Sequence, residues 1–390
     1  MIDLSNDQLQ DTINALLNKE EGLNELLEMI LNGLMKLERR QFLSQAEQPG
    51  NKGNGYRPGK ALGFGRKLEL QIPRDRLGQF QPVLWMLLKD QAEEVRRLCF
   101  ELYGKGLTTY QIGEITEKIY GAYYSSSAIS SFNQELADQL AAWRERPLQA
   151  RYPVIYIDAI HTKVRREHVS SEAFYVVLGL TETMQREVLA IESIPTESAE
   201  GWRGLLRGLT ERGLAQTELV VADGLPGLDR AIHQIFPEAR HQRCVTHFKR
   251  NILTKVKASH KESIAAELKK IFRTGQDTYT RQQALQRIDA MVDRWGKKYR
   301  HIAKLRQRED LDYYLTYLDF HPEVQSMLYT TNWIERLNRS FRRTLKIRGA
   351  LPSSQAALLL LSKAAVDQES GRFDYPIYNF KFDETLFPDN

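Results

Sequence analysis

The hydrophobic positions of this chain change their spacing along the sequence, and each change predicts a different kind of element. Residues 6–47 repeat apolar side chains every three or four positions, which is typical of two amphipathic helices that pack on another surface or on a second copy. Residues 48–67 are rich in Gly, Lys and Arg and predict a flexible basic connector. Its cations either contact phosphates or are only solvated.

The next stretch predicts a short strand at 67–72 followed by three helices. The first helix runs from Val83 to Gly104, the second contains Ile112, and the third begins near Ser126, where serine caps helices well. This arrangement is typical of a helix-turn-helix unit. The third helix would then point short polar groups at DNA, namely Ser127, Ser130, Ser131, Asn133 and Gln134. A small helical bundle with polar outward positions has the same pattern, so both interpretations stay open.

From Tyr152 onward the pattern alternates between strands and helices. Apolar runs predict strands at 153–158, 173–180, 187–194 and 218–222, with helices at 197–213 and 226–236. This order predicts a mixed sheet with helices on its faces and matches the ribonuclease H-like α/β fold. Residues 251–327 show only helical patterns and predict an all-α insertion. The expected regions are 1–60 (helices and linker), 61–150 (DNA-binding domain), 151–250 with 328–366 (catalytic domain), 251–327 (insertion) and 367–390 (tail).

Composition narrows the class of protein. An apolar content of 42% in 390 residues is enough for ordinary globular cores. Cys99 and Cys244 are the two cysteines, which excludes a disulfide framework and a four-cysteine zinc site. The sequence has no apolar run long enough to span a bilayer, and the amino end is acidic and polar, unlike a signal peptide, so we expect a cytoplasmic protein without membrane contact.

Two carboxylates are predicted at the ends of buried strands. Asp158 ends the run YPVIYID, and Asp223 follows ELVVA and enters the turn GLPG. A buried carboxylate needs a cation or hydrogen-bond donors, and paired carboxylates at one sheet edge are typical of a hard-cation site. The alternatives are that Asp158 is a structural acid paired with an arginine and that Asp223 is only a turn residue.

A third carboxylate lies on the basic segment TTNWIERLNRSFRRTLK. Asn332 is a favourable helix start, after which Glu335, Asn338 and the following arginines fall on one helix face. With Asn332 as the N-cap, Glu335 would occupy the capping-box position, which is a purely structural alternative. The capping role and a ligand role can coexist, and Asp319 or Glu323 would be the third ligand if this helix were placed differently. The net charge of +5 is modest, but the basic side chains crowd this segment and suit a polyanion.

Four motifs together resemble the Mutator-related family of bacterial insertion-sequence transposases. They are YPVIYIDAI, ELVVADGLPGL, RCVTHFKRN and TTNWIERLNRSFRRTLK, and the resemblance covers most of the chain. It implies a DNA transposase with an Asp-Asp-Glu site on a ribonuclease H-like core, formed here by Asp158, Asp223 and Glu335. It also implies binding to terminal inverted repeats and target DNA, a homodimer or larger assembly, and a place on the bacterial nucleoid.

The expected chemistry is displacement at phosphorus by an activated oxygen. Two Mg²⁺ ions about 4 Å apart, or Mn²⁺ in their place, suit this reaction. Asp158 would bridge both ions, with Asp223 on one and Glu335 on the other; water would free a 3′-hydroxyl, which would attack target DNA. The expected DNA contacts are Arg336, Arg339, Arg342, Arg343, Lys249, Arg250, Ser130 and Asn133, and the expected structural or orienting residues are Cys244, His247, Asn332 and Asn338.

Some alternatives remain at this stage. His241, Cys244 and His247 form a possible zinc cluster that still requires a fourth ligand. In the resembled family, a Cys and a His with the spacing of Cys244 and His247 recur after the second carboxylate, which implies an orienting role near the metals. The competing functions are a catalytically inactive DNA-binding relative and a nuclease without strand transfer.

Overall fold

The computed structural model describes residues 22–45, 50–62, 67–120, 124–165, 168–194, 198–371, 373 and 375–377. The chain divides into two compact units, Met1–Asp138 and Gln139–Asn390. The predicted helix near residues 6–17 and most of the 367–390 tail lie outside the described residues. None of the described helices is long and apolar enough to cross a membrane.

The first unit begins with a helix packed on a two-stranded hairpin. Helix α2 (Gly22–Gln45) contacts strands β1 (Gly53–Leu62) and β2 (Lys67–Asp75), which pair antiparallel. The prediction of a flexible linker at 48–67 was therefore wrong over most of its length. At Gly59 an added Cβ would meet the Trp85 ring at 2.7 Å and Ile72 at 2.8 Å. Gly59 therefore permits close packing in strand β1. The glycine-rich composition of this segment nevertheless resembles that of a loop.

Three helices follow in the same part of the chain, as the periodicity predicts. They are α3 (Val83–Gly104), α4 (Thr109–Tyr120) and α5 (Ser126–Arg144), the last of which crosses the boundary between the two units. The Ser125 hydroxyl accepts the Ala128 N–H at 3.2 Å and so caps α5. Ser130 is exposed, but Asn133 is 6% exposed and packs inside. The prediction that Asn133 points outward to DNA was wrong, because its position falls on the buried stripe of α5 that also holds Ile129 and Leu136.

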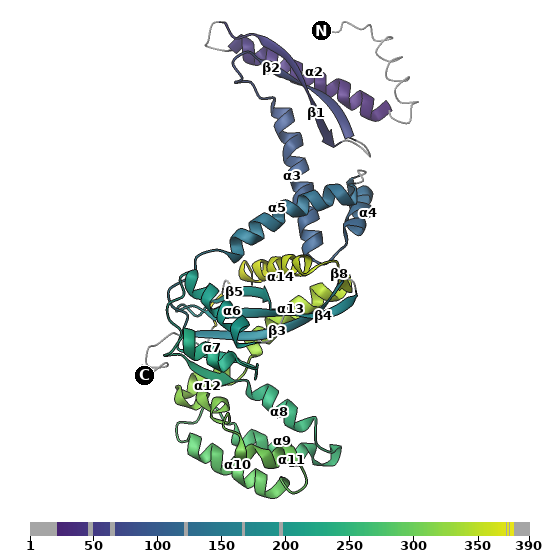
Figure 1. The fold of residues 1–390 in the computed structure, drawn as a ribbon. Helices are drawn as coiled ribbons and strands as arrows, with labels where there is room; N and C mark the ends of the chain where they lie inside the picture. Colours follow the sequence, from purple (N-terminus) through teal and green to yellow (C-terminus); the bar gives the residue numbers. More distant parts are fainter. Residues whose placement is uncertain are drawn as a thin grey trace. The chain divides into compact units, whose positions relative to one another are not determined.

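The second unit is built on a six-stranded mixed sheet, and it confirms the predicted mixed α/β class (Figure 1). The strand order is β5-β4-β3-β6-β7, with β8 pairing β3. Strands β3, β4 and β5 are antiparallel, whereas β6, β7 and β8 run parallel to their neighbours. Their bounds are β3 Val154–Arg165, β4 Val169–Leu180, β5 Arg186–Ser193, β6 Leu219–Ala222, β7 Arg240–Arg243 and β8 Ala350–Leu351.

Helices cover both faces of this sheet. On one face, α6 (Ala199–Glu211) and α7 (Leu228–Ile235) pack against Ile155, Ile157 and their neighbours in a continuous apolar core. Helices α13 (Asn332–Arg348) and α14 (Ser354–Glu369) contact β3, and α14 also contacts β5. Because side chains alternate along a strand, Asp158 faces away from the core that contains Ile155 and Ile157. It lies on the α13 side.

Residues 245–328 form only helical turns, as their periodicity predicts. The α-helices are α8 (Val245–Leu253), α9 (Ala258–Ile271), α10 (Arg281–Trp295), α11 (Arg300–Ala303) and α12 (Pro322–Leu328), with 3₁₀ turns at Lys304–Gln307, Asp312–Tyr314 and Thr316–Asp319. The segment leaves the sheet directly after β7 and returns through α13. It therefore joins the strand next to Asp223 to the helix that carries Glu335.

Candidate active site

The first two carboxylates lie side by side because of the strand register. Strands β3 and β6 are parallel, and Ile157 pairs with Ala222. Asp158 and Asp223 each follow these paired residues by one position, Asp158 within β3 and Asp223 just beyond the end of β6. The prediction that each carboxylate ends its strand holds for Asp223, which follows β6, but was wrong for Asp158, because β3 continues to Arg165.

Asp158 is almost fully enclosed. It is 8% exposed, and its Oδ2 accepts a 2.7 Å hydrogen bond from Nδ2 of Asn338, which is itself fully buried. Burial raises the pKa of Asp158 above its ordinary value, while hydrogen bonds from the Ala159 amide and Asn338 oppose the rise. Among the described residues no arginine or lysine forms an ion pair with it, so the alternative of an arginine-paired structural acid is not supported.

Asp223 combines a turn role with a position in the site. Its Oδ1 accepts the Gly224 N–H at 2.8 Å, and its carbonyl accepts the Leu225 N–H at 2.7 Å. Gly227 then adopts a φ of +79°, and a Cβ there would meet the Ala199 backbone at 2.9 Å. The turn therefore requires glycine and holds Asp223 at the end of β6. The other carboxylate oxygen, Oδ2, faces His247.

Glu335 lies in the first turns of α13, but it is not a capping-box residue. The helix has Thr331 as its N-cap, without a side-chain cap bond, and Asn332 is its first residue. The prediction of Asn332 as the N-cap was thus off by one position. Oε1 of Glu335 instead accepts a hydrogen bond from Oγ1 of Thr331 at 3.2 Å. This bond orients the carboxylate toward the site.

The two alternative third ligands lie elsewhere. Asp319 forms an ion pair with Arg281 at 2.7 Å, and Glu323 is exposed in the first turn of α12. Neither belongs to the group around His247.

His247 joins the second and third carboxylates. Its Nδ1 lies 3.6 Å from Oδ2 of Asp223, and its Nε2 lies 3.7 Å from Oε1 of Glu335. Cys244 precedes the helix that carries His247, and its Sγ lies 3.2 Å from the Thr331 hydroxyl. Thr331 thus touches both Cys244 and Glu335. It was missed in the sequence because threonine before a helix is ordinarily read as a cap.

The groups around His247 stabilise its protonated, positively charged form. A hydrogen bond with Cys244 raises the pKa of His247 to about 9, and the charges of Cys244, Asp223 and Glu335 add to the rise against its burial. Burial alone would raise the pKa of the Cys244 thiol, but hydrogen bonds from His247 and Thr331 outweigh it and lower that pKa. A protonated imidazole therefore balances the carboxylates on either side of it.

One metal-competent group is present in the described part of the chain. Cys244, His247 and Glu335 each offer a ligand atom, and these atoms lie within 4.8 Å of one another. His241 is not a member, because it is buried beside Asp229 at 2.8 Å and packs on the Tyr313 ring. The alternative zinc cluster with His241 was therefore wrong.

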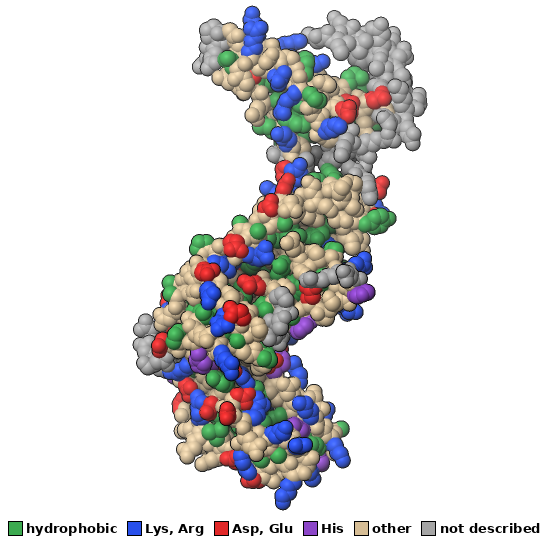
Figure 2. Space-filling view, viewed as in Figure 1, with side chains coloured by type: hydrophobic (Ala, Val, Ile, Leu, Met, Phe, Trp, Pro, Cys, Tyr) green, Lys and Arg blue, Asp and Glu red, His purple; other side chains and the backbone are tan. Residues whose placement is uncertain are grey.

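The residues that we predicted to contact DNA differ in their solvent exposure. Arg336, Arg339, Arg342, Arg343 and Arg250 are exposed, whereas Lys249 is partly buried with its Nζ over the Phe272 and Tyr329 rings. Over the face drawn in Figure 2, basic side chains are interspersed with acidic ones in the second unit. In the first unit basic side chains gather over α2 and the hairpin in that view.

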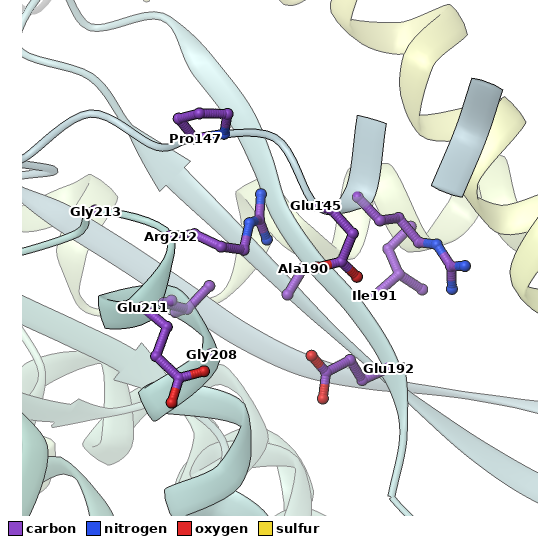
Figure 3. Close-up of a pocket in the computed structure, with 11 residues that line it drawn as sticks. Glu145, Pro147, Ala190, Ile191, Glu192, Gly208, Glu211, Arg212 and Gly213 are labelled. Atoms are coloured by element: carbon purple, nitrogen blue, oxygen red, sulfur yellow. The ribbon is translucent and has the colours of Figure 1, made fainter. Parts of the chain in front are cut away.

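A separate cavity lies away from these carboxylates. It has a volume of about 630 Å³ and is lined by the end of α6, by β5 and by the segment before β3, including Glu192, Arg212 and Glu145 (Figure 3). None of Asp158, Asp223 and Glu335 lines it. The carboxylate site lies instead at the carboxyl end of β6, where His247 of α8 and Glu335 of α13 approach Asp223 and Asn338 of α13 contacts Asp158.

Comparison with known proteins agrees with the motifs. A profile of the family described as "Transposase, Mutator family" matches residues 3–372. The chain belongs to the Mutator family of transposases. This confirms the family that the sequence motifs predict, and the match spans both units of the structure.

Several Mutator-family relatives cover nearly the whole chain. The transposase for insertion sequence element IS1201 of Lactobacillus helveticus is 32% identical over 351 residues, which are 89% of this chain and 93% of the relative. The transposase for IS256 in transposon Tn4001 of Staphylococcus aureus is 29% identical and covers 93% of this chain and 94% of its own. The Drosophila P element transposase strand transfer complex aligns with 75% of this chain and 83% of its own at 8% identity, but its TM-score of 0.30 carries no argument.

Proposed function

We propose that this chain is the DNA transposase of an insertion sequence. It binds the terminal inverted repeats, cleaves phosphodiester bonds with divalent metal ions and joins the resulting 3′-hydroxyl ends to target DNA. The observation that carries the proposal is the meeting of Asp158, Asp223 and Glu335, from β3, β6 and α13, in a Mutator-family chain. The ribonuclease H-like core is part of the same proposal.

The donor set fits hard divalent cations. Carboxylate oxygens are the ligands that Mg²⁺ and Mn²⁺ prefer, and Asp158 carries a buried charge that a cation would offset. Asp158, Asp223 and Glu335 would together hold the ions. When bound, the ions supply the charge that activates the attacking oxygen and stabilises the leaving oxygen.

The protein's own residues orient this site. Asn338 fixes the Asp158 carboxylate through the 2.7 Å bond, and Thr331 fixes Glu335. His247 lies between Asp223 and Glu335 and offsets their repulsion. The proposed reaction needs no covalent intermediate between the protein and DNA. The nucleophiles are water in the first step and the freed 3′-hydroxyl in the second.

DNA binding is assigned to basic and polar surfaces on both units. On α13, the exposed arginines Arg336, Arg339 and Arg343 lie three or four residues apart and share one helix face. Arg342, Arg250 and Lys249 extend the basic character near the site. In the first unit, α3 to α5 would act as a helix-turn-helix-like domain with Ser130 exposed. Two DNA ends must be brought together, so we expect a homodimer or a larger assembly.

The test is an end-processing assay on DNA from the element that encodes the protein. Labelled end fragments are incubated with protein and Mg²⁺, and precleaved ends with target DNA are tested separately for joining. We expect cleavage and joining by the wild type and neither reaction by Asp158→Asn, Asp223→Asn or Glu335→Gln. Binding without cleavage would identify an inactive DNA-binding protein, and cleavage without joining a nuclease; both would refute the proposal.

A further inference from the structure

Cys244, His247 and Glu335 combine ligand types that magnesium does not require. Cys244 immediately precedes α8, His247 lies in its first turn, and Glu335 lies near the start of α13. Their ligand atoms lie within 4.8 Å of one another, and among the described residues this is the one such group of three or more. A thiolate and an imidazole favour a softer ion than Mg²⁺, and zinc binds both.

The spacing suits a tetrahedral ion with three protein ligands. Zn–N and Zn–O bonds of about 2.0–2.1 Å at a tetrahedral angle place N and O roughly 3.3 Å apart. Nε2 of His247 and Oε1 of Glu335 lie 3.7 Å apart, so small side-chain rotations close the difference. Cys244 supplies the third ligand from a fully buried position. The fourth position stays open to water or to an oxygen of DNA.

The surroundings also match a zinc site. With Nε2 of His247 on the ion, Nδ1–H faces Oδ2 of Asp223 at 3.6 Å, slightly longer than a hydrogen bond, so a small side-chain rotation would form the carboxylate–histidine–zinc arrangement that orients an imidazole ligand. The amide of Thr331 lies 3.5 Å from Sγ of Cys244, and its hydroxyl lies 3.2 Å from the same sulfur. The amide stabilises a thiolate, and the hydroxyl does so as well when its single proton turns from Glu335 to the sulfur. Cys244 and His247 therefore have outer neighbours of the kind that zinc sites use.

We propose that Cys244, His247 and Glu335 form a Zn²⁺-binding site that overlaps the magnesium site and inhibits the enzyme when occupied. Zinc binding takes Glu335 as a ligand and releases two protons to solvent, one from the Cys244 thiol and one from Nε2 of the protonated His247. Glu335 is then unavailable to a magnesium ion, and Asp223 is engaged by His247. The inhibitory consequence rests on the proposed function, whereas the binding site does not.

Cobalt(II) provides the direct test of binding, because it replaces zinc and absorbs strongly when a thiolate binds it. The purified full chain is titrated with Co²⁺ in thiol-free buffer, followed by Zn²⁺. We expect a thiolate-to-cobalt band in the wild type that zinc abolishes. Cys244→Ser should lack the band, and Cys99→Ser, which changes the other buried cysteine, should keep it. Absence of the band in the wild type, or its survival in Cys244→Ser, would overturn the proposal.

Glu335→Gln tests the third ligand without touching a cysteine. Calorimetric titration should show zinc affinity lowered roughly 10- to 100-fold in this variant and unchanged in Cys99→Ser. Unchanged affinity in Glu335→Gln would remove Glu335 from the site and with it the overlap. Circular dichroism of each variant separates a lost ligand from a lost fold.

Inhibition is measured separately on DNA-end cleavage. Zinc should inhibit the wild type, and raising Mg²⁺ should relieve the inhibition. Cys244→Ser should need at least tenfold more zinc for the same fractional loss of its own rate. Inhibition that excess Mg²⁺ does not relieve would contradict the overlap. Absence of any magnesium-dependent cleavage would refute the proposed function and leave the cobalt result to decide the zinc site.

Discussion

Asn338 donates a 2.7 Å hydrogen bond from Nδ2 to Oδ2 of Asp158, a residue 180 positions away in the sequence. Both side chains are buried, and Glu335 lies one helical turn before Asn338 on α13. The bond therefore ties the helix that carries the third carboxylate to the strand that carries the first. The relation between these two elements sets the geometry of the whole site.

Asn338→Ala should damage both stability and activity. It removes the donor to Asp158 and leaves a cavity, so we expect a loss of roughly 1–3 kcal/mol in unfolding free energy. Asn338 contacts a proposed metal ligand, so removing its side chain should slow cleavage about 10- to 100-fold. Urea unfolding and end cleavage measure the two effects. The matched control is Lys346→Ala, at an exposed position of the same helix, which should change stability by less than about 0.5 kcal/mol. Equal stability of the two variants would contradict the role of the bond.

Asp158→Asn should abolish cleavage and yet stabilise the metal-free protein near neutral pH. Burial raises the pKa of Asp158 above 3.8, so the native state holds this proton to a higher pH than the unfolded state. Stability is lost as pH rises from 3.8 through the native pKa, because the buried group must ionise. The variant avoids this penalty.

The measurement is the thermal midpoint of wild type and Asp158→Asn across pH, without metal. The midpoint of the variant should be higher at about pH 7, and the difference should disappear below pH 3.8. Added Mg²⁺ should raise the midpoint of the wild type more than that of the variant. A variant that is less stable than the wild type at neutral pH would contradict the buried-charge argument.

His247 should titrate far above an ordinary histidine. Its pKa is raised from 6.5 to about 9, first by Cys244 and then by Asp223 and Glu335. Since the folded pKa is raised, the stabilisation it brings is complete below pH 6.5 and is lost as pH rises through about 9. NMR titration of the metal-free protein should show this shift, and Cys244→Ser should lower the pKa. An ordinary pKa in the wild type would exclude the Cys244 contact.

Arg243 should contribute more to stability than other ion-paired arginines. Its largely buried guanidinium donates to both Asp229 of α7 and Asp310 of the helical segment. Arg243→Met leaves Asp229 with only the buried His241 beside it, while Asp310 keeps its ion pair with Arg308, and the change should cost about 3 kcal/mol. Arg306→Ala is the control, because Arg306 also pairs with two aspartates, Asp289 and Asp293, but at the surface. The control should lose much less in urea unfolding, because water screens exposed ion pairs; similar losses in both variants would refute the distinction.

The basic face of α13 should contribute to DNA affinity through phosphates. Removing Arg339 and Arg343 together should weaken binding to specific and unrelated DNA alike. It should also reduce the slope of log K against log salt by about 0.9 for each lost phosphate contact. Filter binding at several salt concentrations gives the slope. Arg294→Ala, an exposed arginine on α10 paired with Glu267, should leave it unchanged. An unchanged slope in the double variant would place the DNA elsewhere.

Apolar periodicity predicted most strands and helices of the second unit, but it did not predict strands with polar sequences. The runs around Val154, Val176 and Val220 form the strands expected of them. Strand β7 was missed because its sequence is RHQR. Its two buried residues contact specific partners: Gln242 accepts the Tyr317 amide at 2.7 Å, and His241 lies beside Asp229. Such partners come from distant segments and leave no local signal.

Asp158 and Asp223 could be proposed from the sequence because each occurs in a distinctive local sequence. The residues that orient the carboxylates could not be predicted in this way. Asp158 interrupts a buried strand, and Asp223 enters a glycine turn. Thr331 acquires its role only when α8 approaches α13, since it contacts both Cys244 and Glu335. Strand β1 was not predicted because its glycine-rich composition resembles that of a linker. In the structure Gly59 allows close packing against Trp85. In each case tertiary contact decided what the local sequence left ambiguous.

The central claim is that Asp158, Asp223 and Glu335 together hold two catalytic metal ions. A crystal structure of the protein with element-end DNA and Mn²⁺ tests it most directly, since anomalous scattering locates each manganese ion. We predict two peaks about 4 Å apart, with Asp158 between them and Asp223 and Glu335 on opposite sides. Manganese bound without Glu335, or no manganese at Asp158, would contradict the account.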